Sequence, residues 1–142
     1  MQISVVYHHP QLPPLTQIAV GDWIDLRAAE TVQMKAGEYR LISLGVSMLL
    51  PDGYEAHVAP RSSTFRSFGI LQTNGVAVID HSYCGNEDIW RFPALAMRDT
   101  EIRFGDRICQ FRLMPVMGAC TIQKVDFLTA PNRGGFGSTG SR

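Results

Sequence analysis

Apolar and polar residues alternate along most of the chain, which is the pattern of β-strands that bury one face. The alternation is clearest in residues 3–7, 44–48 and 54–58, where apolar side chains recur at every second position. Further extended segments are predicted at residues 23–26, 32–34, 76–79, 89–95, 108–114 and 121–125. Because many short strands follow one another at short spacing, the pattern predicts an all-β fold of the sandwich, jelly-roll or small-barrel type.

Turns and one short helical segment separate the predicted strands. Glycine-containing turns are expected at Gly37, Gly53, Gly85 and Gly105. Residues 61–68 depart from the alternation and predict one or two helical turns, with Ser62 as the N-cap. The Gly/Ser-rich residues 131–142 carry no core-forming pattern. The sequence therefore predicts one domain over residues 1–130 and a flexible C-terminal arm over residues 131–142.

Composition narrows the classes of function. The 142 residues contain 13 Lys plus Arg and 13 Asp plus Glu, so the formal net charge is zero, which argues against stable nucleic-acid binding through a basic face. The three cysteines lack the spacing of a zinc site or a disulfide framework. Because neither a signal peptide nor a membrane-spanning apolar run is recognisable, we expect a cytoplasmic protein that does not bind membranes.

Two segments carry residues that suit a phosphorylated ligand. In residues 133–140, glycines allow backbone N–H groups to approach an anion, and Arg133, Ser138 and Thr139 add side-chain donors. This segment is no P-loop, because the lysine of that motif is missing, and a frayed tail is the alternative. Residues 60–63 place Arg61 beside a predicted helix start, which makes either a phosphate site or a simple capped turn.

A third segment, residues 74–85, contains an apolar strand that ends at Asp80, with Tyr83 three positions later. Asp80 is either a turn residue or a general base held at a strand end. Tyr83 offers a flat wall for a ring. Residues 21–29 and 105–110 are two further turn-to-strand segments that indicate no chemistry on their own.

In this order and spacing, the five segments resemble the five signature motifs of the trimeric dUTP pyrophosphatases (dUTPases). The resemblance covers residues 21–140 and is closest to the versions of Gram-positive bacteria and their phages. It implies a distorted jelly roll of the dUTPase (β-clip) type, assembled as a homotrimer with three sites that each draw on several subunits. It also implies hydrolysis of dUTP to dUMP and pyrophosphate, which keeps uracil out of DNA and supplies dUMP for dTMP synthesis.

The resemblance also assigns roles to residues. Asp80 would orient and deprotonate the attacking water, and Asp25 would act on a phosphate-bound Mg²⁺ only through water. The residues expected to contact the phosphates are Arg61, Ser62, Ser63, Gln110, Arg133, Ser138 and Thr139, with Ser62 near the α–β bridging oxygen. The residues expected to contact the nucleoside are Asn74, Ala77, Val78, Ile79, Tyr83, Phe136 and Gly137. Phe136 would cover the uracil, and Phe92 is the alternative ring for this lid.

The sequence departs from the family pattern in three respects, and it also bears on two competing functions. Ala77 stands where the family often has glycine, Cys84 replaces a basic or polar residue, and the last motif is two residues shorter than usual. The related dCTP deaminases place a catalytic glutamate where this chain has Trp90, which disfavours deamination. The aromatic, acidic insert of residues Asn86 to Phe92 is the surface expected to bind a regulatory protein partner, if the chain also has that role.

Overall fold

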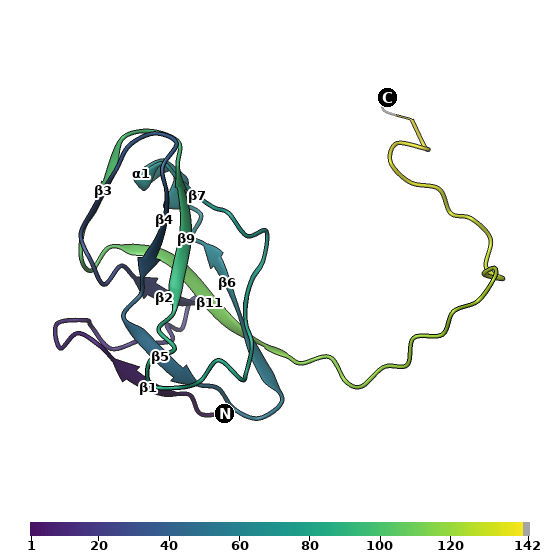
Figure 1. The fold of residues 1–142 in the computed structure, drawn as a ribbon, viewed down its shortest axis with the longest axis horizontal. Helices are drawn as coiled ribbons and strands as arrows, with labels where there is room; N and C mark the ends of the chain where they lie inside the picture. The colour runs from purple at the N-terminus through teal and green to yellow at the C-terminus, as the bar shows by residue number, and fades with distance from the viewer. Residues whose placement is uncertain (141–142) are drawn as a thin grey trace.

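The computed structural model describes residues 1–140 as an almost entirely β structure with one short helix (Figure 1). The first strands are β1 (Ser4–Tyr7), β2 (Ile24–Arg27), β3 (Val32–Met34), β4 (Tyr39–Ser43), β5 (Val46–Leu49) and β6 (Tyr54–Pro60). After the helix α1 (Thr64–Phe68) come β7 (Ile70–Gln72), β8 (Ala77–Ile79), β9 (Arg91–Ala96), β10 (Thr100–Ile102) and β11 (Arg107–Pro115). The predicted all-β fold with one helical segment is confirmed.

All strand pairs are antiparallel, and the largest sheet has the order β2-β11-β6-β8. A second sheet has the order β4-β9-β7, and β1-β5 and β10-β3 form two-stranded sheets. The long strand β11 lies in the centre of the largest sheet, where Gln110 pairs with Asp25 of β2 and with Ala59 of β6. β2 and β8 are therefore the two opposite edges of this sheet.

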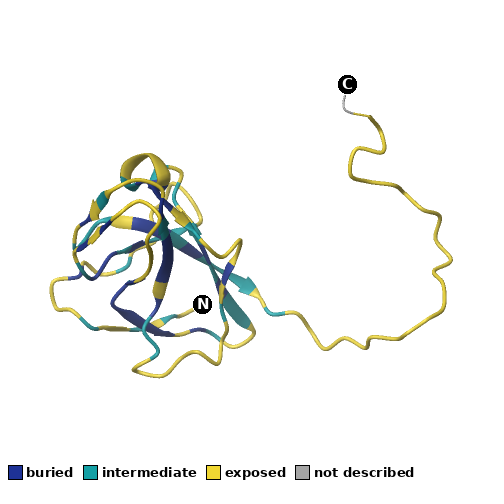
Figure 2. Ribbon diagram, turned by 45° about the horizontal axis from the view of Figure 1, so that its top comes forward, coloured by how far each residue is buried: buried dark blue, intermediate teal, exposed yellow. Residues whose placement is uncertain are grey.

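The inward faces of the sheets form one apolar core (Figure 2). Trp90, Phe92 and Phe111 are among its largest fully buried side chains. The rings of Trp90 and Phe111 meet edge to face, with centroids 5.3 Å apart and an interplanar angle of 81°. This arrangement is a favoured aromatic geometry, and it fixes β11 against the segment that enters β9.

The helix has the one to two turns that were predicted, but its N-cap position differs. It begins after Ser63, which makes no side-chain capping hydrogen bond, so the expected N-cap at Ser62 is wrong. It ends at Phe68, and the C-cap Gly69 has a left-handed φ of 62°, a conformation that glycine adopts without the steric cost of a Cβ.

The C-terminal extension, residues 116–140, leaves the body after β11 and runs away from it (Figures 1 and 2). It is exposed except at the half-buried Val116, whose backbone N–H donates to Gly53 O at 2.9 Å. The strand predicted at 121–125 is absent, because this extension has no pairing partner in the described part of the chain. The expected arm also included Ser141 and Arg142, which lie outside the described residues.

No helix among residues 1–140 has the length and apolar character needed to cross a membrane.

Candidate active site

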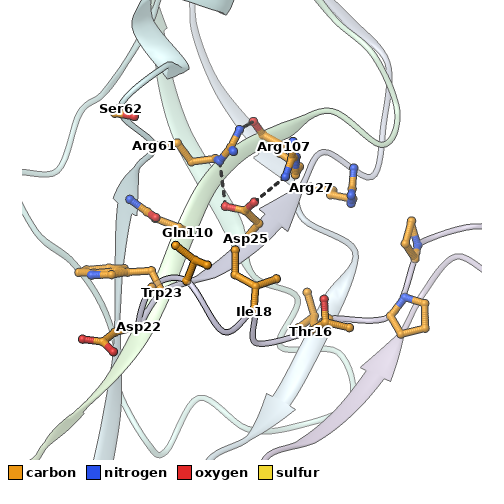
Figure 3. Close-up of a pocket in the computed structure, with 15 residues that line it drawn as sticks. Thr16, Ile18, Asp22, Trp23, Asp25, Arg27, Arg61, Ser62, Arg107 and Gln110 are labelled. Carbon is orange, nitrogen blue, oxygen red and sulfur yellow. Dashed lines mark hydrogen bonds and ion pairs between the residues drawn. The ribbon is translucent and has the colours of Figure 1, made fainter.

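A cleft of about 360 Å³ lies between residues 13–23 and the strands β2 and β11 (Figure 3). It brings together four residues that the sequence placed in three separate segments, namely Asp25, Arg61, Ser62 and Gln110. Asp25 and Gln110 meet because they are paired across β2 and β11, and Arg61 follows directly after β6, the other neighbour of β11. The sheet register therefore assembles this part of the candidate site.

Asp25 forms ion pairs with two arginines in the cleft (Figure 3). Arg61 Nε lies 2.8 Å from Asp25 Oδ1, and Arg107 Nη1 lies 3.1 Å from Asp25 Oδ2. Each guanidinium has five N–H donors, so both arginines keep donors that can bind phosphate oxygens. Asp25 thus orients two cations toward the same cleft.

Gln110 and Ser62 complete the polar lining of the cleft. Gln110 Nε2 donates a hydrogen bond to Pro60 O at 3.1 Å, which fixes the amide beside the turn that carries Arg61. The second N–H of this amide stays available for a ligand. Ser62 lines the cleft with an exposed side chain, whereas Ser63 occupies the N-cap position of α1 and is absent from the lining.

The carboxylates of the cleft do not form a metal cage. Within residues 1–140 no group of three or more His, Cys, Asp or Glu side chains could hold an ion. Both oxygens of Asp25 already contact guanidinium groups, which leaves this residue suited to accepting hydrogen bonds from metal-bound water. This fits Mg²⁺, which keeps several water ligands and binds to substrate phosphates in nucleotide enzymes.

Asp80 follows β8 and has the contacts of a turn residue, which is one of the two roles that the sequence left open. Its Oδ1 accepts hydrogen bonds from Ser82 Oγ at 2.6 Å and from Ser82 N–H at 2.8 Å, so the side chain closes a local turn. The Ser82 hydroxyl, the Ser82 amide and the nearby His81 lower the pKa of Asp80, the hydroxyl most of all. Asp80 is therefore ionised at neutral pH. Its Oδ2 makes no hydrogen bond among the described residues.

Tyr83 is held beside Asp80 with part of its ring open. Its N–H donates to Asp80 O at 3.0 Å, and its hydroxyl donates to Ile89 O at 3.3 Å. The residue is 41% exposed, so the ring is available for packing against a ligand. The side chain of Ala77 is buried, so its methyl group points into the core and leaves the outer surface of β8 unchanged.

The β8 segment, residues 74–83, does not line the cleft that contains Asp25 and Arg61. The strands β2 and β8 are opposite edges of one sheet, with β11 and β6 between them. Neighbouring strands are about 4.8 Å apart, so the two edges are about 14 Å apart. One chain therefore holds the cleft and Asp80 as two separate surfaces.

The candidate residues of the last segment are distant from both surfaces. Arg133, Phe136, Gly137, Ser138 and Thr139 lie in the extension and are exposed (Figure 2). Ser138 N–H donates to Gly135 O at 3.0 Å, which closes a turn around Phe136. Phe136 adopts a φ of 51°, which is uncommon for a residue other than glycine, and its ring points into solvent.

A model of the dUTPase family matches residues 12–140. The chain belongs to the dUTPase family. It is 54% identical over 142 residues to the SPbeta prophage-derived deoxyuridine 5'-triphosphate nucleotidohydrolase of Bacillus subtilis (strain 168), with 100% of both chains covered. The protein is thus an enzyme, a dUTP diphosphatase.

Solved dUTPases have the same fold. The dUTPase from Streptococcus mutans superposes with a TM-score of 0.74 at 26% identity, over 85% of this chain and 100% of that one. A mutant dUTPase from phage phi11 of S. aureus, described with a coordinated structural Mg(II) ion, superposes with a TM-score of 0.76 at 15% identity. That superposition covers 89% of this chain and 98% of the phage chain.

Phe92 is not an alternative lid in this dUTPase. It lies in β9 with no exposed surface, so its ring cannot reach a nucleobase. Trp90 is equally buried, and its backbone N–H donates to Val46 O at 2.9 Å. The expectation of an aromatic partner-binding insert at 86–92 is therefore wrong for its aromatic residues, which belong to the core. Residues 86 and 87 remain exposed in this segment, and Asp88 is half-buried.

Sequence reasoning missed the two other arginines of the cleft, Arg27 and Arg107. Arg27 Nη1 donates to Gly105 O at 2.7 Å, and Arg107 contacts Asp25 from the first position of β11. Arg107 follows a Gly-Asp turn and precedes Gln110 by three positions, and this proximity to Gln110 was the feature of the sequence that could have indicated it. Its partner is 82 positions away in the sequence, and only the register of β2 on β11 brings the two together.

Proposed function

We propose that this dUTPase hydrolyses dUTP at a composite site of a homotrimer. One subunit would supply the cleft with Asp25, Arg61, Ser62 and Gln110, and a neighbour would supply the β8 segment with Asp80 and Tyr83. The observation that carries this proposal is the placement of the two surfaces on opposite edges of one sheet. Copies related by rotation can bring the β8 edge of one subunit to the cleft of the next.

Exposed apolar side chains support an assembly of copies. Val76 and Val78 of the β8 segment are 62% and 50% exposed, and Leu41 and Leu71 lie exposed on the sheet β4-β9-β7. Ile122, Phe127 and Leu128 are exposed in the C-terminal extension. Surfaces of this kind indicate contacts with other protein chains. Residues 121–125, which were expected to be extended and have no partner strand among residues 1–140, fit an extension that packs on another subunit.

The chemistry follows from the charges in the two surfaces. The cleft would bind the triphosphate through Arg61, Arg107, Gln110 and Ser62, with cationic and neutral donors that match phosphate oxygens. Asp80 would orient a water molecule toward the α-phosphorus and accept its proton as pyrophosphate leaves. Its low pKa keeps the carboxylate ionised and ready to accept that proton, at some loss of base strength. Mg²⁺ bound to the triphosphate would neutralise charge, with Asp25 reaching its water ligands.

Selectivity would come from the β8 segment and the extension. Backbone groups of residues 74–79 would pair with the uracil edge, and a pocket of this kind rejects cytosine because its own polar groups are left unpaired. Tyr83 would pack on the deoxyribose and leave no room for a 2′-hydroxyl. The extension would close over the nucleotide, with Phe136 against uracil and Arg133, Ser138 and Thr139 on the outer phosphates.

Pyrophosphate release from four nucleotides tests this proposal. With Mg²⁺ we expect release from dUTP, and a preference over dCTP of about 10⁴-fold, because an unpaired buried group penalises the wrong base. UTP and dTTP should also be poor substrates, and a chelator of divalent cations should suppress the reaction. Comparable rates with UTP or dCTP would contradict the roles given to Tyr83 and to the backbone of residues 74–79.

A further inference from the structure

Thr64 is one of two buried polar residues in the described part of the chain, the other being Ser47. It is the first residue of α1, and none of its surface is exposed. Burying a hydroxyl is unfavourable unless it forms hydrogen bonds. Thr64 Oγ1 forms two, because Arg61 N–H donates to it at 2.8 Å and it donates to Ile108 O at 2.9 Å.

These two hydrogen bonds insert the hydroxyl into the ladder between β6 and β11. The last pair of this ladder is Pro60 with Cys109. If the register continued, Arg61 would face Ile108 across the two strands, and their backbone groups would be neighbours. Instead the Thr64 hydroxyl lies between Arg61 N–H and Ile108 O and satisfies both groups. The chain can therefore leave the sheet at Arg61 without leaving either backbone group unpaired.

The inserted hydroxyl joins the two backbone segments that carry the side chains of the cleft. Arg61 and Ser62 belong to the turn after β6, whereas Arg107 and Gln110 belong to β11. Two other hydrogen bonds join these segments, Gln110 Nε2 to Pro60 O at 3.1 Å and Arg61 Nη1 to Arg107 O at 3.5 Å. Both of these hydrogen bonds use partly exposed side chains, so water and phosphate can compete with them. The hydroxyl group of Thr64, by contrast, is buried.

We propose that Thr64 is a positioning residue, whose hydroxyl sets the position of Arg61 and Ser62 relative to Arg107 and Gln110. The inference rests on the proposed function, in which these side chains bind the triphosphate. Without the hydroxyl, Arg61 N–H and Ile108 O would approach each other directly, and the turn would shift toward β11. The Arg61 guanidinium would then lose its alignment with Asp25 and with the substrate.

Two substitutions separate positioning from packing. Thr64→Val keeps the shape of the side chain and removes the hydroxyl, whereas Thr64→Ser keeps the hydroxyl and removes a buried methyl group. A packing role predicts that valine is the milder change. A positioning role predicts instead that Thr64→Val lowers kcat/KM more than Thr64→Ser does. Thr64→Ala and Thr64→Ser form a second pair, since both lack the methyl group and differ in the hydroxyl alone.

The test measures kcat and KM for dUTP, together with the midpoint of urea unfolding, for these variants in the full chain. We expect Thr64→Val to lower kcat/KM by about 10- to 100-fold, the scale of a displaced contact residue, and Thr64→Ser to stay within about threefold of the original. Thr31→Val is the matched control, because Thr31 Oγ1 accepts a hydrogen bond from Phe104 N–H at 3.0 Å at an exposed position outside the cleft. It should leave kcat/KM unchanged.

Arg61→Ala separates failure of this inference from failure of the proposed function. Suppose that Arg61→Ala lowers kcat/KM. If Thr64→Val then has the same kcat/KM as Thr64→Ser, the positioning role is overturned and the proposed function stands. Where the valine variant does not fold, Thr64→Ala takes its place in this comparison. If Arg61→Ala has no effect, the proposed phosphate contacts and the inference are overturned together. A loss that follows the hydroxyl in either pair, without a parallel change in the unfolding midpoint, supports the inference.

Discussion

Replacing Asp80 with asparagine should lower kcat for dUTP by about 10²- to 10⁴-fold, the usual cost of removing a general base. Asparagine keeps the shape of the side chain and an oxygen that can accept from Ser82, so the local turn should persist. The amide cannot accept a proton from water, so turnover should fall. Binding of a non-hydrolysable dUTP analogue should change little, because Asp80 is not assigned to binding. Steady-state kinetics and calorimetric titration measure the two effects separately.

Asp88 provides the matched control for this substitution. Its Oδ2 accepts a hydrogen bond from Gly85 N–H at 2.8 Å, so it also closes a turn in the same part of the chain. Asp88→Asn should leave kcat close to that of the original protein. If Asp80→Asn keeps kcat within about tenfold, Asp80 is a turn residue and not the base.

The pH profile of the original protein supplies a second check on Asp80. A lowered pKa means that the carboxylate stays ionised to a lower pH than an ordinary aspartate. As the pH falls, kcat/KM should therefore persist to a lower pH than an ordinary aspartate, with a pKa of about 3.9, would allow. An acid limb near pH 6 would indicate that another group controls the rate.

Truncation after Pro131 should leave a folded assembly with kcat/KM reduced by about 10²-fold or more, on the scale of lost charge-stabilising donors. The deleted residues include Arg133, Phe136, Ser138 and Thr139, which make no contact with the body of the chain in the structure that would account for stability. Their removal takes away the proposed phosphate donors and the ring that would cover uracil. Size-exclusion chromatography with light scattering would report the assembly, and pyrophosphate release the activity.

Point substitutions in the same segment refine the truncation experiment. Phe136→Ala and Arg133→Ala should each reproduce part of the loss and leave the assembly intact. Dissociation of the truncated protein would show that these last residues hold the subunits together. Full activity after truncation would show that the proposed closure over the nucleotide does not occur.

Strands were predicted correctly where apolar and polar residues alternate. The prediction failed for a strand whose two faces are both exposed, because such a strand shows no alternation. The strands β1, β5 and β6 were expected because their apolar residues recur at every second position, and β11 was expected as an extended segment at residues 108–114. β4 was missed, since Tyr39, Arg40 and Leu41 are all exposed and give no alternation. Residues 121–125 were expected to be extended and find no partner strand among residues 1–140. A pattern that favours an extended segment does not identify the strand with which it pairs.

The candidate site was predicted in its composition and only partly in its geometry. Asp25, Arg61, Ser62 and Gln110 were expected in one site, and the structure places them in one cleft. Phe92 was misread because an aromatic residue near a turn looked like part of a surface loop. Trp90, Phe92, Ala94 and Ala96 alternate and are all fully buried, so the signal for a core strand was present in the sequence. The bridge formed by Thr64 depends on a ladder register that no local pattern encodes.

A subunit-mixing experiment tests the composite site most directly. Arg61→Ala disables the cleft and Asp80→Asn disables the β8 segment, so each variant alone should be nearly inactive. If the two surfaces of a site come from different subunits, refolding the variants together in equal amounts should restore activity, because about one site in four then combines an intact cleft with an intact Asp80. If both surfaces came from the same subunit, the mixture would stay as inactive as its components. Recovery near a quarter of the original activity is the result we expect, and no recovery in assemblies shown to contain both variants would contradict the proposal.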